Sequence, residues 1–330
     1  MTHPLPTFED VLEAGNRIQH YVIETPVLQS EALNKIAGVD LHIKAECLQE
    51  TGSFKLRGAT NRLLQIPIED RSAGVVAYSS GNHAQGIARV SKRLGMPAII
   101  LMPSDAPQVK VDGVLADGAE VRHYDRNSES REEIAEELAR ERGAIIVPSY
   151  NDAMIVAGQG TCGLEFAKQI ELADKSLDHL ICCASGGGLI GGIALALEGK
   201  SPSTKVWAAE PVEHDDWIRS LKAGEIRPNA SGTRSVCDAL LIQEPGSITW
   251  PIGARLFSGG YGVTDAQVFE AMRLACRHLK VVVEPGGAAA LAAALFCLPE
   301  DVKGSTVGVV LTGGNVDMDL YTDVLAGRKD

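Results

Sequence analysis

The sequence predicts an α/β protein built from two open, twisted, mostly parallel sheets flanked by helices. Short apolar runs of strand length alternate with segments of helical periodicity along nearly the whole chain, a pattern typical of parallel sheets covered by helices. The 330 residues exceed one typical hydrophobic core, so two α/β units are expected. A content of 45% hydrophobic residues with 34 glycines fits a globular, glycine-rich protein.

The expected strands and helices divide into two series. The first series has strands at 75–78, 98–102, 120–124 and 144–147 and helices at 83–94, 108–117 and 128–142. The second has strands at 41–45, 179–184, 206–209 and 307–311 and helices at 8–21, 31–37, 53–64, 153–170, 189–197, 265–279 and 288–296. We expect residues 1–67 and 153–330 to form a large domain and residues 74–151 a small domain. The polar segment 215–243 is expected to be a surface excursion.

Charge and cysteine content restrict the class of function. The net charge of −12 argues against nucleic acid and anionic membranes as partners. The first ten residues lack a basic segment followed by an apolar run, and no stretch is apolar enough to span a bilayer, so we expect a cytoplasmic protein. The seven cysteines show no CxxC spacing, which predicts reduced, mostly buried thiols and no zinc site.

A single lysine in the stretch TGSFKLRGA is the first candidate for chemistry. Lys55 lies between Phe54 and small residues, at the start of the helix expected over 53–64. To act as a nucleophile its amine must lose a proton, and burial or a neighbouring positive charge, such as Arg57 or a cofactor, would lower its pKa. The alternative is a structural lysine, which the stretch taken alone favours.

Two loops that follow expected strands and open expected helices are candidate anion sites. In SSGNHAQG, residues 79–86, backbone N–H groups and the side chains of Asn82 and His83 suit a carboxylate, and Ser80 offers a hydroxyl for proton transfer. A plain helix cap is the alternative. In SGGGLIGG, residues 185–192, three consecutive glycines and a helix N-terminus suit a phosphate, although the loop matches neither a dinucleotide-binding nor a Walker motif. Here the alternative is a tight turn.

Two further strand ends carry polar groups. LTGGNVD, residues 311–317, places Thr312 where its hydroxyl can bond a ring nitrogen or simply serve a turn. AAEPVEHDD, residues 208–216, provides the carboxylates of Glu210, Asp215 and Asp216, and two carboxylates with a backbone carbonyl suit Mg²⁺ or Ca²⁺. An acidic surface loop is the alternative for this second stretch.

Seven motifs occur in one order along the chain: SFKLRGA, SSGNHAQG, VAGQGT, SGGGLIGG, AAEP, EPGGA and TGGNVD. In this order they resemble the serine/threonine dehydratase and serine racemase family, whose members are fold type II pyridoxal phosphate enzymes. The resemblance covers nearly the whole chain. It implies pyridoxal phosphate as cofactor, in the cleft between the large and the small domain, an amino acid as the small-molecule substrate, and a homodimer.

The resemblance also implies a role for each motif. Lys55 would hold the cofactor covalently and act as the base, and Ser80 matches the residue that serves the opposite face of the substrate in racemases of the family. Cofactor contacts are implied for Phe54, Lys55, Asn82, Ser185, Gly186, Gly187, Gly188, Leu189, Glu284 and Thr312. Substrate contacts are implied for Ser79, Ser80, Asn82 and His83, and a divalent cation, Mg²⁺ or else Ca²⁺ or Mn²⁺, is implied at Glu210, His214 and Asp216.

The implied reaction removes water from a β-hydroxy-α-amino acid and yields a 2-oxo acid and ammonia. L-Threonine, L-serine and 3-hydroxyaspartate remain open as substrates; the last needs a cation for its second carboxylate, and Arg131 and Lys110 are candidates. An amino acid racemase is the main alternative, followed by a β-replacing synthase and a catalytically silent binding protein. Two departures from the family pattern are Thr312, where many relatives have serine, and CDALL at 237–241, where relatives often have ADG.

Overall fold

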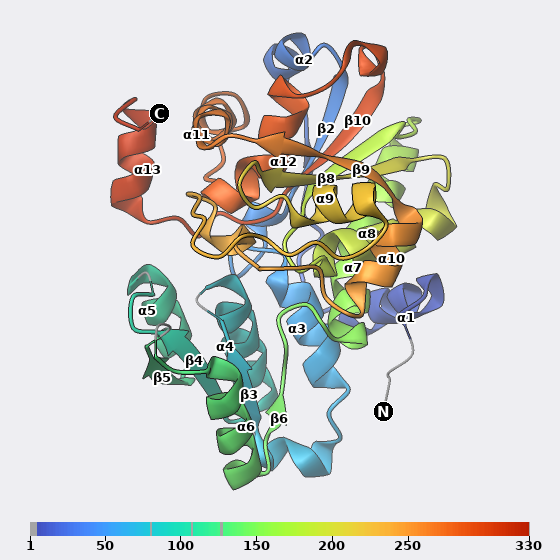
Figure 1. The fold of residues 1–330 in the computed structure, drawn as a ribbon. Coiled ribbons are helices and arrows are strands. Elements are labelled where there is room, and N and C mark those ends of the chain that lie inside the picture. The colour runs from blue at the N-terminus through green and yellow to red at the C-terminus, as the bar shows by residue number, and fades with distance from the viewer. Residues whose placement is uncertain (1–4, 80, 107, 126–127, 330) are drawn as a thin grey trace.

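Two sheets organise the part of the chain that the structure describes, residues 5–79, 81–106, 108–125 and 128–329 (Figure 1). In this computed structural model the six-stranded sheet has the order β1-β2-β10-β7-β8-β9 and is parallel except for β1. The four-stranded sheet, in the lower half of Figure 1, has the order β5-β4-β3-β6 and is parallel throughout. The predicted α/β class with two mostly parallel sheets is confirmed.

The strands of the six-stranded sheet are β1 (Val27–Leu28), β2 (Asp40–Ala45), β7 (His179–Cys183), β8 (Lys205–Pro211), β9 (Phe257–Val263) and β10 (Thr306–Leu311). Those of the four-stranded sheet are β3 (Val75–Tyr78), β4 (Ala98–Pro103), β5 (Glu120–Tyr124) and β6 (Ile145–Ile146). Strands β3, β4 and β5 are followed by α4 (Asn82–Leu94), α5 (Gln108–Ala116) and α6 (Arg131–Arg142). The other helices are α1 (Phe8–Ile18), α2 (Glu31–Ala37), α3 (Lys55–Leu64), α7 (Ala153–Leu172), α8 (Gly188–Lys200), α9 (Asp216–Ala223), α10 (Thr249–Leu256), α11 (Asp265–Leu274), α12 (Pro285–Phe296) and α13 (Met318–Leu325).

Each strand and helix expected from the sequence is present, with ends shifted by a few residues. The helix expected over 265–279 is α11 followed by a π-helical turn, Ala275–Leu279. The expectations omitted β1, β9, α9, α10 and α13. Strand β9 has the sequence FSGGYGV, whose glycines weaken a strand signal, and it lies at the sheet edge where fewer residues are buried.

The prediction that 215–243 is a surface excursion holds for only part of the segment, since residues 222–225 and 230–232 are exposed. The segment contains α9, and Trp217 and Cys237 within it are fully buried. Its last part, residues 238–242, lines the main cavity of the molecule. Polarity and turn residues suggested exposure throughout, but the two ends of the segment carry buried side chains, and its last part contacts the cavity.

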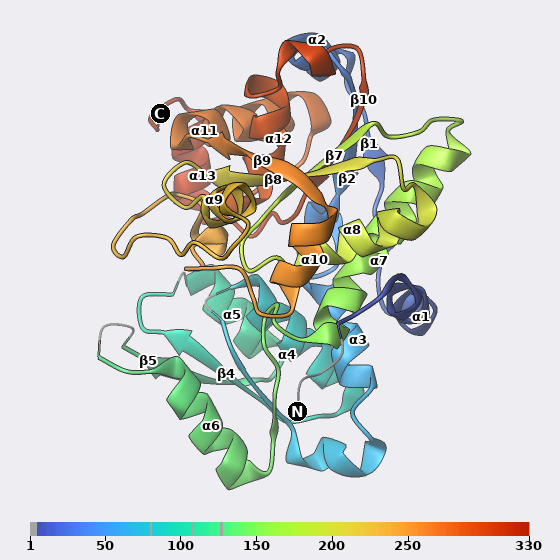
Figure 2. The same cartoon turned by 45° about the vertical axis from the view of Figure 1, so that its right-hand side comes forward.

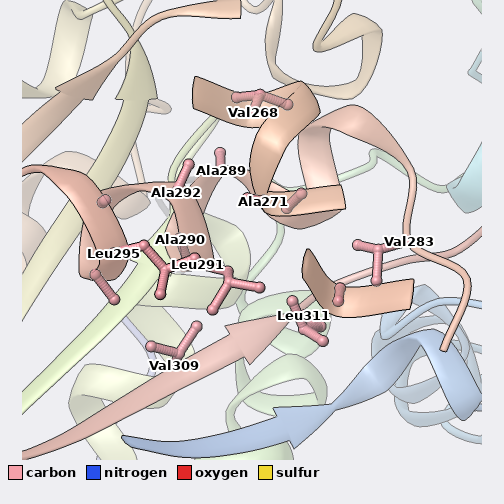
Figure 3. Packing of buried hydrophobic residues seen from close by; sticks show 14 of the residues in the cluster. Val268, Ala271, Val283, Ala289, Ala290, Leu291, Ala292, Leu295, Val309 and Leu311 are labelled. Atoms are coloured by element: carbon pink, nitrogen blue, oxygen red, sulfur yellow. The ribbon is translucent and has the colours of Figure 1, made fainter. Parts of the chain in front are cut away.

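Helix α12 forms the centre of the larger core. Figure 3 shows its alanines and Leu291 packed between Val309 and Leu311 of β10 on one side and Val268 and Ala271 of α11 on the other. Every residue from Pro285 to Leu295 is buried. An alanine-rich helix can approach a sheet and a second helix closely on both sides, which explains why α12 is apolar all round.

The two sheets are joined through helix α3. It contacts α7 on one side and α4 on the other, and Figure 2 shows it between them. Glycines permit these close crossings: a Cβ at Gly58 would lie 2.4 Å from the Gln159 side chain, and one at Gly86 would lie 3.2 Å from the Lys55 carbonyl oxygen. The start of α3, which carries Lys55, is thereby held against α4.

The structure also bears on the expectations about the cysteines and about membrane-spanning helices. All seven cysteines are free thiols, five of them buried, as predicted. None of the helices in the described part of the chain combines the length and apolarity needed to cross a membrane.

Candidate active site

A cavity of about 490 Å³ lies where strands of both sheets end. It is lined by the segments that follow β3, β6, β7 and β10, which is where open α/β sheets bind ligands. The predicted site residues that line it are Phe54, Lys55, Ser79, Asn82, His83, Arg131, Ser185, Gly186, Gly187, Gly188, Leu189, Glu284 and Thr312. Ser80 lies outside the described residues. The three predicted metal ligands lie elsewhere: Glu210 on β8, Asp216 at the start of α9, and His214 in the turn between them.

Lys55 is the first residue of α3, and its amine reaches into the cavity. Its Nζ donates a hydrogen bond to the Ser149 carbonyl at 2.9 Å and lies 5.1 Å from the centre of the Phe54 ring. Burial lowers the pKa of Lys55 from 10.5 to about 8. Arg57 does not contribute as expected, because its guanidinium turns away to Glu46 and Glu165. The amine is therefore neutral in a large fraction of molecules near pH 8.

The glycine loop, residues 185–189, connects β7 to α8. Gly187 has a φ of 89°, a left-handed conformation that favours glycine, and a Cβ on it would lie 2.3 Å from the Trp217 ring. A Cβ on Gly186 would lie 2.3 Å from the Tyr150 ring. The Ser185 hydroxyl is buried without a hydrogen-bond partner. Unpaired N–H groups at the start of α8 and this hydroxyl form a site that suits a phosphate.

The start of α4 presents Asn82 to the cavity. Asn82 Nδ2 donates to Glu284 Oε1 at 2.5 Å, and Asn82 Oδ1 accepts from Asn315 Nδ2 at 2.8 Å. One N–H of the Asn82 amide remains for a ligand. Burial raises the pKa of Glu284 to about 7, although the nearby Lys110 ammonium opposes this shift.

His83 lines the same wall as a neutral imidazole. Burial lowers the pKa of His83 to about 3. Its Nε2 lies 3.0 Å from the Val147 carbonyl, which can only accept, so the proton is on Nε2, and Nδ1 is a buried acceptor without a partner. The ring therefore cannot donate to a carboxylate, and any carboxylate bound here would rely on the backbone N–H groups of the first turn of α4.

Thr312 follows β10 and faces the cavity beside a thiol. Its Oγ1 lies 3.4 Å from Cys183 Sγ, and both groups are buried. A hydroxyl at this point can donate to or accept from a ligand atom without adding a charge. Cys183 was not among the residues selected from the sequence.

The two candidate cations for a second substrate carboxylate differ in their partners. Lys110 Nζ lies 2.7 Å from Asp238 Oδ2 and 3.7 Å from Glu284 Oε2, so two carboxyl groups already balance it. Arg131 stacks over the Tyr78 ring at 5.2 Å and pairs with Glu132 at 2.7 Å, in a pair whose side chains are 40% and 52% exposed. An exposed pair of this kind contributes little and is readily exchanged for another carboxylate.

Sequence reasoning missed one segment of the cavity wall. Residues 148–151, which include Ser149 and Tyr150, follow β6 and precede α7. The strand-to-helix rule applied to the other loops would have identified them. Residues 238–242 also line the cavity, and they overlap CDALL, whose departure from the family pattern had pointed to a change in the shape of the pocket near the cofactor. That segment follows no strand, so only the resemblance to the family could have indicated it.

The predicted cation ligands form a buried acidic pair. Glu210 accepts backbone N–H groups of Trp217 and Ile218 at 3.0 and 2.9 Å. Asp216 Oδ1 accepts from Asn229 at 2.7 Å, while Oδ2 is buried without a partner. Burial raises the pKa of Asp216 to about 6, and burial together with Asp216 raises the pKa of Glu210 well above its usual range.

The side chain of the third predicted ligand turns away from this pair: His214 Nε2 lies 3.2 Å from the Thr233 hydroxyl. Among the described residues, no group of three or more His, Cys, Asp or Glu side chains is arranged to hold a metal. The predicted set uses only two carboxylates with the His214 carbonyl, and the unpaired Asp216 oxygen fits a cation there.

The chain matches a known protein family over most of its length. A family described as "Pyridoxal-phosphate dependent enzyme" matches residues 18–313. The L-threo-3-hydroxyaspartate ammonia-lyase of Saccharomyces cerevisiae is 39% identical over 99% of this chain and 98% of its own length. A serine racemase of Arabidopsis thaliana is 40% identical over 97% of this chain and 96% of its own length.

Among solved structures, maize serine racemase has the same fold. It superimposes with a TM-score of 0.91 at 36% identity and covers 98% of both chains. The cavity described above has the groups that a pyridoxal phosphate needs: an amine of lowered pKa, a glycine loop with an unpaired hydroxyl, and a neutral hydroxyl at the end of β10.

Proposed function

The chain belongs to the pyridoxal-phosphate-dependent enzyme family, and on this premise we propose that it is an ammonia-lyase that removes water from a β-hydroxy-α-amino acid, with 3-hydroxyaspartate as the preferred substrate. The observation that carries the substrate class is Arg131. It lines the same cavity as Lys55, and its ion pair with Glu132 is exposed. The ammonia-lyase of Saccharomyces cerevisiae, which is similar over its full length, acts on such a dicarboxylate by its name.

The geometry of the cavity supports particular residues as the ones that would hold the cofactor. The glycine loop and the Ser185 hydroxyl suit its phosphate, Asn82 its ring hydroxyl, and Thr312 its ring nitrogen. When bound, pyridoxal phosphate supplies an aldehyde for amines and an electron-withdrawing ring that stabilises negative charge at the substrate Cα. Thr312 is uncharged, so the ring would withdraw electrons moderately, which suits an elimination that relieves the charge at once.

The remaining steps depend on residues of the chain itself. Backbone N–H groups of the first turn of α4 would hold the substrate α-carboxylate, and Arg131 would hold the side-chain carboxylate. With both ends fixed, the Cα proton is directed at Lys55, whose lowered pKa leaves a neutral amine to accept it. Glu284, with a pKa of about 7, would be partly ionised near pH 7 and accepts the hydrogen bond of Asn82 Nδ2.

The experiment that tests this function measures 2-oxo acid and ammonium release with added pyridoxal phosphate and Mg²⁺. L-Serine, L-threonine and each stereoisomer of 3-hydroxyaspartate are compared as substrates. The highest kcat/KM is expected with one 3-hydroxyaspartate stereoisomer. A higher value with serine or threonine would contradict the substrate class and leave a serine/threonine dehydratase.

A racemase is the second candidate, because a serine racemase of Arabidopsis thaliana is equally similar. Both reactions begin by removing the Cα proton, and racemisation returns a proton from the opposite face. Chiral analysis of the unreacted amino acid distinguishes them. Inverted substrate without oxo acid would mark the chain as a racemase.

We further propose a divalent cation, Mg²⁺ or else Ca²⁺ or Mn²⁺, at the acidic pair. Two buried carboxyl groups with raised pKa values and an unpaired Asp216 oxygen support it, because a cation would restore their ionised forms.

We also propose that residues 1–67 and 153–330 form a large domain and residues 74–151 a small domain. Finally, we propose that the chain forms a homodimer in the cytoplasm. The seven free thiols support a reducing compartment.

A further inference from the structure

Two side chains donate hydrogen bonds to backbone carbonyls of the glycine loop. Trp217 Nε1 donates to the Ser185 carbonyl at 2.6 Å, and Thr249 Oγ1 donates to the Gly186 carbonyl at 2.5 Å. Trp217 comes from α9 and Thr249 from the start of α10, two helices that the sequence patterns did not reveal. Both residues are fully buried.

These bonds fix the direction of the loop amides. A trans peptide unit is planar, and its C=O and N–H point in opposite directions. The Ser185 carbonyl shares its peptide unit with the Gly186 N–H, and the Gly186 carbonyl shares its unit with the Gly187 N–H. Drawing both carbonyls toward Trp217 and Thr249 therefore turns both N–H groups away from these helices and into the cavity.

Packing makes the arrangement rigid. The Trp217 indole lies against the loop, since a Cβ at Gly187 would come 2.3 Å from its ring and 2.9 Å from Thr249. The indole is held in turn by Trp250 and Phe257, with ring centres 5.9 and 5.0 Å away. Its own backbone N–H is bound by Glu210, so α9 cannot shift without breaking that contact.

We propose that Trp217 and Thr249 are positioning residues for the phosphate of the cofactor: their hydrogen bonds to the Ser185 and Gly186 carbonyls aim the amides of Gly186 and Gly187 at it. The inference rests on the proposed binding of pyridoxal phosphate in this cavity. Neither residue touches the cofactor; both act through the loop. The Gly186 carbonyl also accepts the Gly246 N–H at 3.3 Å, so the Trp217 bond is the less replaceable of the two.

The test compares two ligands that differ only in the phosphate. Dissociation constants for pyridoxal phosphate and for pyridoxal are measured by absorbance titration of the full-length apo protein, in the wild type and in the Trp217→Phe and Thr249→Val variants. We expect about 5- to 10-fold weaker binding of pyridoxal phosphate in Trp217→Phe, the loss of about one net hydrogen bond, and a smaller loss in Thr249→Val. Pyridoxal binding should stay the same.

Trp207→Phe is the matched control. It also removes one indole hydrogen bond in the region of the larger sheet, the contact of 3.1 Å to His179, but one that does not involve the glycine loop. It should bind both ligands as the wild type does. Unchanged pyridoxal phosphate binding in Trp217→Phe, or equal losses for both ligands, would overturn the inference, because a merely structural residue would loosen the whole cavity.

Ligand binding by the wild type tests the proposed cofactor site separately from the positioning role of Trp217 and Thr249. If the wild-type chain binds pyridoxal phosphate covalently and more tightly than pyridoxal, the proposed cofactor site stands whatever the variants do. If it shows no uptake or no preference for the phosphate, the proposed cofactor site and the positioning role fail together.

Discussion

Lys55 owes its lowered pKa to the cavity around it rather than to a neighbouring cation. Its ammonium form is disfavoured by burial, while Arg57, two residues away in sequence, points to the opposite side of α3 and is neutralised there. A lysine with the same sequence neighbours on an exposed helix face would not be buried, and its pKa would not be lowered in this way. The chemistry of the residue therefore depends on where α3 begins.

The uptake of pyridoxal phosphate by the apo protein should follow this pKa. Only the neutral amine attacks an aldehyde, so the rate constant should rise with pH and level off above a midpoint near 8 instead of 10.5. Rapid mixing at a series of pH values, followed by absorbance, measures it. Lys55→Arg should show no covalent uptake, and a midpoint near 10.5 in the wild type would contradict the effect of burial.

Arg131 should decide between substrates. Arg131→Gln removes the cation proposed for the second carboxylate, so kcat/KM for 3-hydroxyaspartate should fall about 10- to 100-fold, the value of a hydrogen bond to a charged group. The kcat/KM for L-serine should change little. Arg142→Gln, which removes an exposed arginine at the other end of α6, is the control. Equal losses for both substrates would exclude a role in specificity.

At the scale of elements, a buried network of charges joins β2, α3 and α7. Arg57 makes paired hydrogen bonds to Glu46 at 2.7 and 2.8 Å and to Glu165 at 2.6 and 2.7 Å, and Lys44 donates to Glu165 at 2.9 Å. Burial opposes the ionised form of Glu46, but Arg57 outweighs it, and the pKa of Glu46 is lowered. The network holds α3, and therefore Lys55, against the larger sheet.

Breaking this network should cost much stability. Arg57→Met leaves Glu46 and part of Glu165 without compensation and should lower the free energy of unfolding by about 3–5 kcal/mol. Arg255→Met, which removes an exposed arginine paired with Glu198, should lower it by less than about 1 kcal/mol. Urea denaturation of both variants measures the difference. A loss in Arg57→Met as small as in Arg255→Met would show that packing alone holds α3.

At the scale of the whole molecule, the acidic pair and the cofactor cavity are connected through α9. Glu210 binds the backbone of Trp217, and the indole of Trp217 binds the glycine loop. A cation at the pair would bind the folded chain alone, because Glu210 and Asp216 meet only after β8 and α9 have formed. Cation binding should therefore stabilise the fold and the loop together.

Removal of divalent cations should lower the melting temperature by about 5 °C if the ion was present at roughly 100 times its dissociation constant. Differential scanning fluorimetry with chelator, and then with added Mg²⁺, measures the loss and its recovery. Asp216→Asn should not respond to chelator. Asp215→Asn should respond like the wild type, because Asp215 pairs with Arg219 instead. An unchanged melting temperature in the wild type would refute the cation site.

The sequence by itself determined the fold class and most of the elements. Alternating apolar runs are sufficient for a parallel sheet covered by helices, and loops that follow strands gather at one edge of each sheet whatever the strand order. This rule alone does not bring loops of two sheets together. The order of the seven motifs, through its resemblance to one family, predicted that the stretches around Lys55, Asn82, Ser185 and Thr312 share a site, and all four stretches line one cavity.

Only the tertiary structure decided which of these groups are charged, paired or free. Lys110 looked equivalent to Arg131 as a cation, but Asp238, distant in sequence, balances it. His83 looked like a donor, but burial and the Val147 carbonyl make it neutral and occupied. The role of Trp217 could not be predicted from the sequence, because its indole bonds to a loop 32 residues away and no periodic sequence pattern indicates such a contact. Burial and long-range partners set pKa values and hydrogen bonds, and neither is written in local sequence.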